Sequence, residues 1–249
     1  MLKIKSPINN KINYNENDKN DINNLDKNTD EEASIFFNFL KKKPHSIYVF
    51  GKLIGLLNDY SLEFKNLRAL CVGSDFLKEY LTVKFFTNKL DCIDLDQSII
   101  EDHKYLANKY KLNIGYEKKD IFNFDTSPYE ILLLYQMDYN FSDLQLKDII
   151  SKFSNKPKKF IVVMSPSIFN LTILNNPLII FFNLFSYIYF LFKKIILDIK
   201  FLKNKNYEVN YKRTSHEIIK LFQKLNFKLV KKEYFLVNNQ NYSLYLFKN

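Results

Sequence analysis

The chain has 249 residues and a net charge of +10, from 37 Lys and Arg against 27 Asp and Glu. This length supports one domain with a sizeable core and some additional segments. The charge would favour polyanions as partners, but the only arginines are Arg68 and Arg213, and direct reading of bases relies on arginine. We therefore expect no nucleic acid partner.

The first part of the chain changes composition near residue 31. Residues 1–30 are rich in Asn, Asp and Lys, which bury too little surface to offset the entropy of ordering. We expect a disordered N-terminal arm there, and no signal peptide, because no apolar segment of the required kind is present. Residues 31–62 place apolar side chains at helical spacing, which predicts an N-terminal helical cover.

From residue 63 onward, short apolar runs alternate with helical patterns, which is typical of an α/β fold with a parallel sheet. The expected strands are 68–72, 90–95, 113–118, 130–135 and 159–164, followed by a C-terminal hairpin of 227–235 and 242–248. The expected helices are 75–86, 97–111, 142–153 and 214–226. Two cysteines, Cys71 and Cys92, fall inside the apolar runs, where a thiol is usually a small buried hydrophobe. Such free thiols suit a reducing cytoplasm.

Glycine and acidic residues follow the first three strands. Gly73 ends the first strand, Asp94 stands 21 residues later at the end of the second, and Asp120 follows the third. Because the carboxyl ends of parallel strands open on one crevice, we expect these groups to meet around a ligand. A glycine there lets the backbone approach that ligand, and a carboxylate accepts hydrogen bonds from ribose hydroxyls.

These segments resemble the class I S-adenosylmethionine-dependent methyltransferases over residues 67–249. "ALCVGSDF" is similar to that family's glycine-rich first motif, "CIDLDQSII" to the strand with its ribose-binding acid, "KKDIFNF" to the adenine-binding loop, and "YEILLLYQMDY" to the fourth strand. The resemblance implies a Rossmann-like three-layer sandwich with a seven-stranded, mostly parallel sheet that ends in an antiparallel hairpin. It implies S-adenosylmethionine (SAM) as cofactor, bound by Gly73, Ser74, Asp75, Asp94, Leu95, Asp120, Ile121 and Tyr135.

The first motif departs from the family pattern at three positions. Asp75 stands where a second glycine is usual, Leu77 lies near a third, and Cys71 takes the place of a frequent acid. The carboxylate of Asp75 either accepts a hydrogen bond from the amino group of the cofactor or repels its carboxylate. A methyltransferase-like binding or scaffold domain without catalysis is therefore the alternative function.

Methyl transfer from a sulfonium depends mainly on alignment, so the resemblance implies no universal catalytic residue and no metal. The substrate-side candidates are His45, Tyr139, Phe181, Phe185 and Tyr189. His216 is expected on the surface of a first helical turn, since Thr214 and Glu217 form a capping box.

An insertion at residues 166–205 begins inside an uncharged stretch, residues 160–192. Its apolar run 178–192 is shorter than the roughly 20 residues that a membrane span needs. Three partners fit this apolar run: the core of the protein itself, a hydrophobic substrate, or a bilayer interface with nearby lysines at the headgroups. Dimerisation is a further use of the first kind. We expect a cytoplasmic methyltransferase with a small-molecule or lipid-like acceptor, with peripheral contact at the inner membrane face as the third of these uses.

Overall fold

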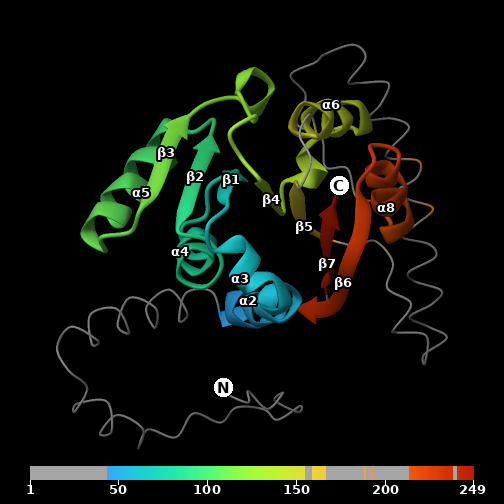
Figure 1. Cartoon of the computed structure of the whole chain (residues 1–249), viewed down its shortest axis with the longest axis horizontal. Helices are drawn as coiled ribbons and strands as arrows, with labels where there is room; N and C mark the ends of the chain where they lie inside the picture. The colour runs from blue at the N-terminus through green and yellow to red at the C-terminus, as the bar shows by residue number, and fades with distance from the viewer. Residues whose placement is uncertain (1–43, 155–158, 167–187, 189–191, 193–212, 238–239) are drawn as a thin grey trace, which may run out of the picture. The chain divides into compact units, whose positions relative to one another are not determined.

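The computed structural model describes residues 44–154, 159–166, 213–237 and 240–249, together with residues 188 and 192. Its seven strands form one sheet in the order β3-β2-β1-β4-β5-β7-β6 (Figure 1). The strands are β1 (Arg68–Val72), β2 (Lys89–Asp94), β3 (Ile114–Lys118), β4 (Ile131–Tyr135), β5 (Phe160–Pro166), β6 (Lys228–Val237) and β7 (Gln240–Lys248).

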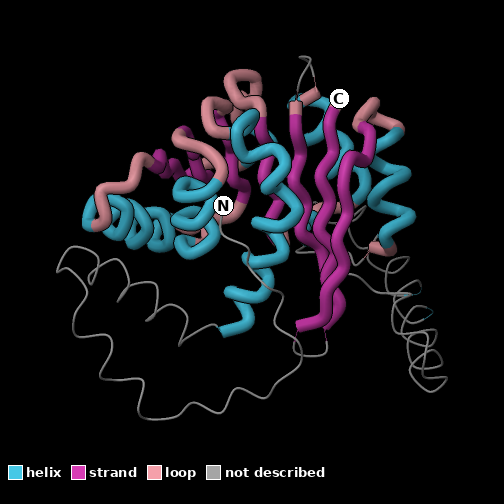
Figure 2. The backbone as a smooth tube through the Cα atoms, turned by 60° about the horizontal axis from the view of Figure 1, so that its bottom comes forward, coloured by secondary structure: helices cyan, strands magenta, loops and turns pink. Residues whose placement is uncertain are grey.

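Strands β1 to β5 pair in parallel, and β7 pairs antiparallel with both β5 and β6. The two long C-terminal strands run side by side in Figure 2, with a register shift between Leu229 and Lys231. Because β7 lies between β5 and β6, the sheet ends in the antiparallel hairpin that the sequence analysis predicted. The predicted α/β, mostly parallel seven-stranded fold is confirmed.

Helices cover both faces of the sheet. Contacts place α2 (Pro44–Leu57), α4 (Phe76–Phe85) and α5 (Gln97–Lys109) on one face, and α6 (Asp143–Phe153) and α8 (Ser215–Gln223) on the other, as Figure 1 shows. Shorter helices are α3 (Ser61–Phe64), η3 (Asn58–Tyr60), η4 (Ile121–Asn123) and η5 (Asp138–Asn140). The predicted helices and strands from residue 63 onward are present, with ends that differ by a few residues.

The burial of each strand follows its place in the sheet. All five residues of the central strand β4, "ILLLY", are buried, and so are the first six of β5. At the edge, β3 buries only Tyr116 of its five residues. A strand covered on both faces therefore reads as an apolar run, whereas an edge strand keeps a polar face.

Side-chain caps start the helices where the sequence predicted them. Ser142 and Thr214 each form a capping box, with Gln145 and Glu217 respectively. The carboxylate of Asp96 accepts a hydrogen bond from the backbone N–H of Ser98 at the start of α5. These caps satisfy N–H groups that have no partner inside the helix, and so they define where each crossover helix begins.

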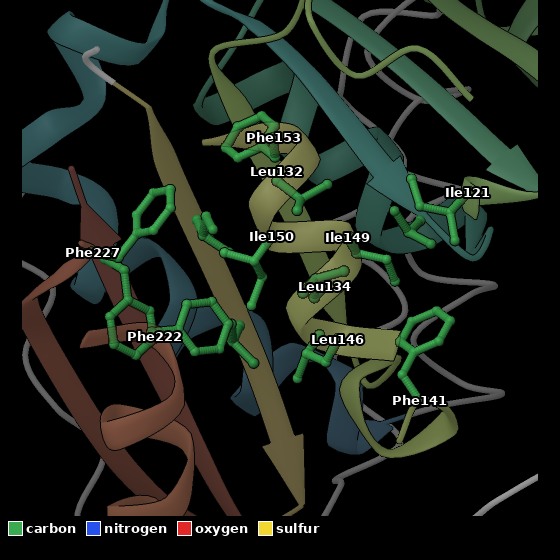
Figure 3. Packing of buried hydrophobic residues seen from close by; sticks show 14 of the residues in the cluster. Ile121, Leu132, Leu134, Phe141, Leu146, Ile149, Ile150, Phe153, Phe222 and Phe227 are labelled. Carbon is green, nitrogen blue, oxygen red and sulfur yellow. The ribbon is translucent and has the colours of Figure 1, made fainter. Parts of the chain in front are cut away.

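The main core cluster lies between the sheet and the α6–α8 side (Figure 3). Leu146, Ile149 and Ile150 of α6 pack on the sheet there, and the rings of Phe222 and Phe247 stack at 4.3 Å. On the opposite side, Leu53, Leu56 and Leu57 of α2 are almost completely buried. The described part of the predicted helical cover thus packs against the rest of the domain.

Several predicted segments lie outside the described residues: the N-terminal arm, residues 31–43, and all of insertion 166–205 except residues 166, 188 and 192. Within the part of the chain that the structure describes, no helix combines the length and the apolar character needed to cross a membrane.

Candidate functional site

The turn after β1 brings its glycine to the carboxyl edge of the sheet. Gly73 has φ +77, a left-handed conformation that side chains rarely adopt, and its N–H donates to the carbonyl oxygen of Ile93 at 2.9 Å. This bond ties the end of β1 to the end of β2. A Cβ at residue 73 would lie 2.5 Å from the Sδ atom of Met137 in the loop after β4. Glycine is thus needed both for the turn and for the close approach of Met137.

Asp94 joins the turn after β1 to the turn after β2. Its Oδ2 atom accepts a hydrogen bond from the N–H of Ser74 at 2.8 Å, and its Oδ1 atom accepts one from the N–H of Asp96 at 2.9 Å. A carboxylate offers about four acceptor sites, so both oxygens retain acceptor capacity. The neighbouring Leu95 is 67% exposed.

The loop after β3 returns to the same edge. The N–H of Lys119 donates to the carbonyl oxygen of Asp94 at 3.1 Å. The next residue, Asp120, caps η4 by accepting a hydrogen bond from the N–H of Phe122 at 3.0 Å. Ile121 is buried in the core cluster. The structure therefore brings Gly73, Ser74, Asp94 and Asp120 together at three adjacent strand ends, as the spacing predicted.

A buried carboxylate that the sequence analysis missed holds the turn after β1. Glu79 of α4 has no exposed surface, and its Oε1 atom accepts hydrogen bonds from the hydroxyl of Ser74 and the N–H of Asp75, both at 2.7 Å. Its Oε2 atom accepts one from the hydroxyl of Tyr116 at 2.6 Å. His103 joins this group through Nδ1, which lies 2.7 Å from Ser74 Oγ.

This arrangement explains how a turn with a single glycine keeps its shape. Three donors converge on one carboxylate, and charge-assisted hydrogen bonds of this kind are stronger than neutral ones. The available sequence signal was the position of Glu79, three residues after Phe76 and three before Thr82, on the buried side of the predicted helix. That signal shows burial but not the partners.

The two cysteines lie beside this group. Cys71 and Cys92 are register partners on β1 and β2, and both are buried, as predicted. The thiol sulfurs of Cys71 and Cys92 and one carboxylate oxygen of Glu79 all lie within 4.8 Å of one another. Burial raises the pKa of the Cys92 thiol well above its ordinary value. Cys92 therefore stays protonated and acts as a small apolar residue at neutral pH.

Tyr135 does not take the place that the family resemblance implied for it. Its side chain is buried, and its hydroxyl lies 3.4 Å from Thr82 Oγ1 under α4. The ring therefore faces the helix layer, and only the backbone of residue 135 reaches the strand end. The side chains that follow β4 in the chain are those of Gln136 and Met137, and both are partly buried.

A second buried carboxylate, Asp138, follows β4. Its Oδ2 atom accepts a hydrogen bond from the hydroxyl of Ser165 at 2.6 Å, whereas its Oδ1 atom has no hydrogen-bond partner among the described residues. Burial, the largest cause, raises the pKa of Asp138 to about 6. The sequence analysis did not single this residue out, because only its contacts with distant residues distinguish it.

Arg213 fixes the loop that carries Asp138. Its guanidinium, which is almost completely buried, donates to the backbone oxygens of Asp138 and Phe141, each at 2.7 Å. Its Nε atom donates to Asp143 Oδ1 at 2.8 Å. Five donors in a rigid fork suit arginine for this role. One of the two arginines of the chain thus connects the start of α8 to the end of β4.

The substrate-side candidates fall in different places. Tyr139 follows Asp138 in η5, and burial together with the charge of Asp138 raises its pKa. It therefore remains protonated at neutral pH and offers a hydrogen-bond donor. His45 lies in the first turn of α2, and nothing of its side chain is described. His216 is exposed in the first turn of α8, as predicted. The candidates Phe181, Phe185 and Tyr189 lie outside the described residues.

Comparisons with known proteins identify the fold. No family model matches the chain, and no curated protein matches it in sequence. Among solved structures, magnesium protoporphyrin IX methyltransferase from Synechocystis PCC 6803, with bound S-adenosylhomocysteine (SAH), gives a TM-score of 0.56 at 9% identity over 82% of this chain and 84% of that one. N-methyltransferase NodS from Bradyrhizobium japonicum WM9 with SAH gives 0.56 at 14% identity, over 84% and 90%.

A SAM-dependent methyltransferase from Methanosarcina mazei gives a TM-score of 0.52 at 12% identity, over 74% of this chain and 93% of that one. At these identities the likeness concerns the fold. The chain has the class I, Rossmann-like fold of SAM-dependent methyltransferases, in agreement with the expected resemblance.

Proposed function

We propose that this protein is a SAM-dependent methyltransferase that acts on a small-molecule or lipid-like acceptor. The observation that carries the proposal is the hydrogen bond that links the turn after β1 to the turn after β2. There the carboxylate of Asp94 binds the N–H of Ser74, directly after the left-handed Gly73. An acid beside a glycine turn at adjacent strand ends is the arrangement that holds the ribose and the adjoining part of a nucleoside ligand in open α/β sheets.

The described residues fit this cofactor. Asp94 has acceptor capacity left for ribose hydroxyls, and exposed Leu95 and capping Asp120 stand beside it on the adenine side. Bound SAM would supply a methyl group activated by a sulfonium. The protein would contribute mainly position, because alignment of donor and acceptor accounts for most of the rate in such a displacement. Tyr139, protonated at neutral pH, would orient an acceptor by hydrogen bonding rather than act as a base.

Titration calorimetry with SAH tests the binding step. The parent protein is expected to bind one equivalent of SAH. The Asp94→Asn variant is expected to bind SAH more weakly. The Asp91→Asn variant is the matched control. Asp91 lies on the same strand, but it pairs with Arg68 at 2.8 Å towards the opposite edge. Absence of SAH binding to the folded parent would contradict the proposal.

The acceptor class rests on the insertion after β5, in which residues 166–192 carry no charged side chain. We propose that its aromatic residues contact a hydrophobic acceptor, or the inner face of the membrane in a protein that is otherwise cytoplasmic. Each buried Å² of apolar surface contributes about 25 cal/mol. Substitution of Phe181, Phe185 and Tyr189 by Ser should preserve SAH affinity and reduce flotation with anionic liposomes. If the parent does not float and the triple variant unfolds, the segment is ordinary core.

A binding domain without catalysis is the second candidate function. It is favoured by the approach of the Met137 side chain to Gly73 and by the presence of Asp75 in the turn. SAH binding without methyl transfer to any compound in a lysate supplied with labelled SAM would support it. Incorporation of label that is lost in Asp94→Asn would support the enzyme instead.

A further inference from the structure

Two thiols and one carboxylate meet in the buried layer under the turn after β1. Cys71 and Cys92 are register partners on the parallel strands β1 and β2, so their side chains lie on the same face of the sheet. Glu79 comes from α4, the helix that packs against β2 on this face (Figure 1). All three residues are at most 2% exposed, and their ligand atoms lie within 4.8 Å of one another. Three groups of the kinds that bind metal ions are therefore enclosed together.

The spacing of these atoms suits a tetrahedral metal ion. Zinc binds thiolate sulfur at about 2.3 Å and carboxylate oxygen at about 2.1 Å, which places the ligand atoms of one ion about 3.6–3.8 Å apart. Atoms that already lie within 4.8 Å need to approach one another by no more than about 1.2 Å to reach this geometry. Zinc accepts three protein ligands with water in the fourth position. Thiolate ligands favour zinc over magnesium and calcium, which prefer oxygen.

The hydrogen bonds of Glu79 hold its carboxylate in the way that metal-bound carboxylates are held. Its donors are the hydroxyl of Ser74, the N–H of Asp75 and the hydroxyl of Tyr116. Partners of this kind orient a ligand and are a regular part of metal sites. All three donors are neutral, and the imidazole Nδ1 of His103 lies 3.6 Å from Glu79 Oε2. Because buried charges in proteins are paired or coordinate metals, a cation beside this carboxylate is favourable.

The proton balance of the thiols is compatible with metal binding. Burial, followed by contact with Cys71 and the charge of Glu79, raises the pKa of the Cys92 thiol, so this thiol keeps its proton while no metal is bound. A divalent ion replaces the thiol protons, because the thiolate is the form of cysteine that binds metals, and the protons pass to the solvent. Two thiolates and one carboxylate then surround a doubly charged cation.

We propose that Cys71, Cys92 and Glu79 form a binding site for a thiophilic divalent ion, with zinc as the ion that this donor set selects. The site is independent of the proposed function, and the family resemblance implies no metal. The Sγ atom of Cys71 lies 3.5 Å from the carbonyl oxygen of Gly73, so the ion is placed directly under the glycine turn. It links the ends of β1 and β2 to α4, and its role is to hold this turn in shape.

Cobalt(II) is the probe for the first test, because its bond to thiolate gives an intense charge-transfer band in the near ultraviolet. The chain contains only two cysteines, so the band reports on this site alone. Because the ligands are buried, Co²⁺ is supplied to the reduced parent during refolding as well as in the native state. One equivalent should produce the band, and Zn²⁺ should abolish it by displacement. Absence of the band from the folded, reduced parent under both conditions would overturn the proposal.

Variants test the three ligands by competition for Zn²⁺ with a chelator. Cys71→Ala, Cys92→Ala and Glu79→Gln should each weaken Zn²⁺ binding by more than about 100-fold. Tyr116→Phe removes only a hydrogen-bond partner, and should cost about 10–100-fold. Glu101→Gln, at an exposed position of α5, is the matched control and should leave the affinity unchanged.

Thermal unfolding completes the test. Zn²⁺ should raise the unfolding temperature of the parent and of Glu101→Gln, but not that of Cys71→Ala, because a ligand stabilises only the state that binds it. Unchanged Zn²⁺ affinity in a folded Cys92→Ala variant would also overturn the assignment. Failure of the parent to bind SAH would contradict the proposed function and leave these measurements unaffected.

Discussion

Replacement of Asp138 by Asn is expected to remove a pH-dependent term from the stability of this domain. Asp138 is completely buried, and its pKa is raised from 3.8 to about 6, with burial as the largest cause and the hydrogen bond from Ser165 acting against it. A carboxyl group whose pKa is raised by folding binds its proton more tightly in the folded chain. The free energy of unfolding therefore increases as the pH falls through 6 and decreases as the pH rises through it.

The magnitude follows from the size of the shift. A difference of about 2 pKa units corresponds to about 3 kcal/mol between the acid and the neutral limits. Integration of the two titration curves assigns about 1.3 kcal/mol of this to the interval between about pH 7 and pH 5. The Asn side chain does not titrate, so the variant lacks this contribution.

Urea unfolding at the two pH values measures the effect. The stability of the parent relative to Asp138→Asn should increase by about 1 kcal/mol when the pH is lowered from about 7 to about 5. Ser165→Ala removes the hydrogen bond that opposes the shift, and should move the pH-dependent interval upward. The same pH dependence in the parent and in Asp138→Asn would refute the argument that burial of this carboxyl controls it.

Three further predictions concern the strand ends and the core. Asp94→Ala should weaken SAH binding by at least ~1.5 kcal/mol, because a hydrogen bond to a charged group is lost; unchanged affinity in a folded variant would remove Asp94 from the site. Gly73→Val should lower both stability and SAH affinity, because the left-handed φ costs about 1–2 kcal/mol and the new side chain meets Met137. In the double variant with Met137→Ala, chemical denaturation should show that only the part of the lost stability caused by the clash with Met137 returns. Full recovery of the stability would argue against a cost from the left-handed backbone. Phe222→Ala should cost about 3–5 kcal/mol of unfolding free energy, since its ring is buried and stacked at 4.3 Å on a neighbour; a loss below about 1 kcal/mol would show that the core does not depend on this packing.

The structure gives Gly73 a contact that the sequence did not predict. The sequence analysis placed a ligand next to Gly73, whereas the structure places the side chain of Met137 within 3.0 Å of the position of a Cβ there. Loss of stability in a Gly73 variant is therefore compatible with a binding site at this turn. Ligand titration of the folded fraction is needed to separate the two effects.

Local sequence patterns were sufficient for the elements of this fold. The apolar runs of β4 and β5, the capping boxes that begin at Ser142 and Thr214, and the C-terminal hairpin all depend on residues close together in the chain. The same holds for the placing of Gly73 and Asp94, because the ends of consecutive parallel strands meet at one edge whatever the details of packing.

Packing decided the remaining features of the site. The family resemblance implied that Tyr135 contacts the cofactor at the strand end, but the alternation of side chains along β4 turns its ring towards Thr82. The position of Glu79 in its helix indicated burial but not its partners, and Asp138 gave no local signal. Tyr116, which binds Glu79, and Ser165, which binds Asp138, lie 37 and 27 residues away from them in the chain.

The sequence by itself determined the order of the strands along the chain, the helix starts and the acids that stand at the strand ends, since periodicity, capping and chain connectivity are local properties. Only the tertiary structure decided which charges are buried and what they bind. Solvation and hydrogen bonding of a carboxylate depend on whichever distant segments enclose it. For that reason the glycine turn could be located from the amino-acid sequence. Only the three-dimensional structure showed that Glu79 supports this turn and that Asp75 pairs with Lys78 beside it.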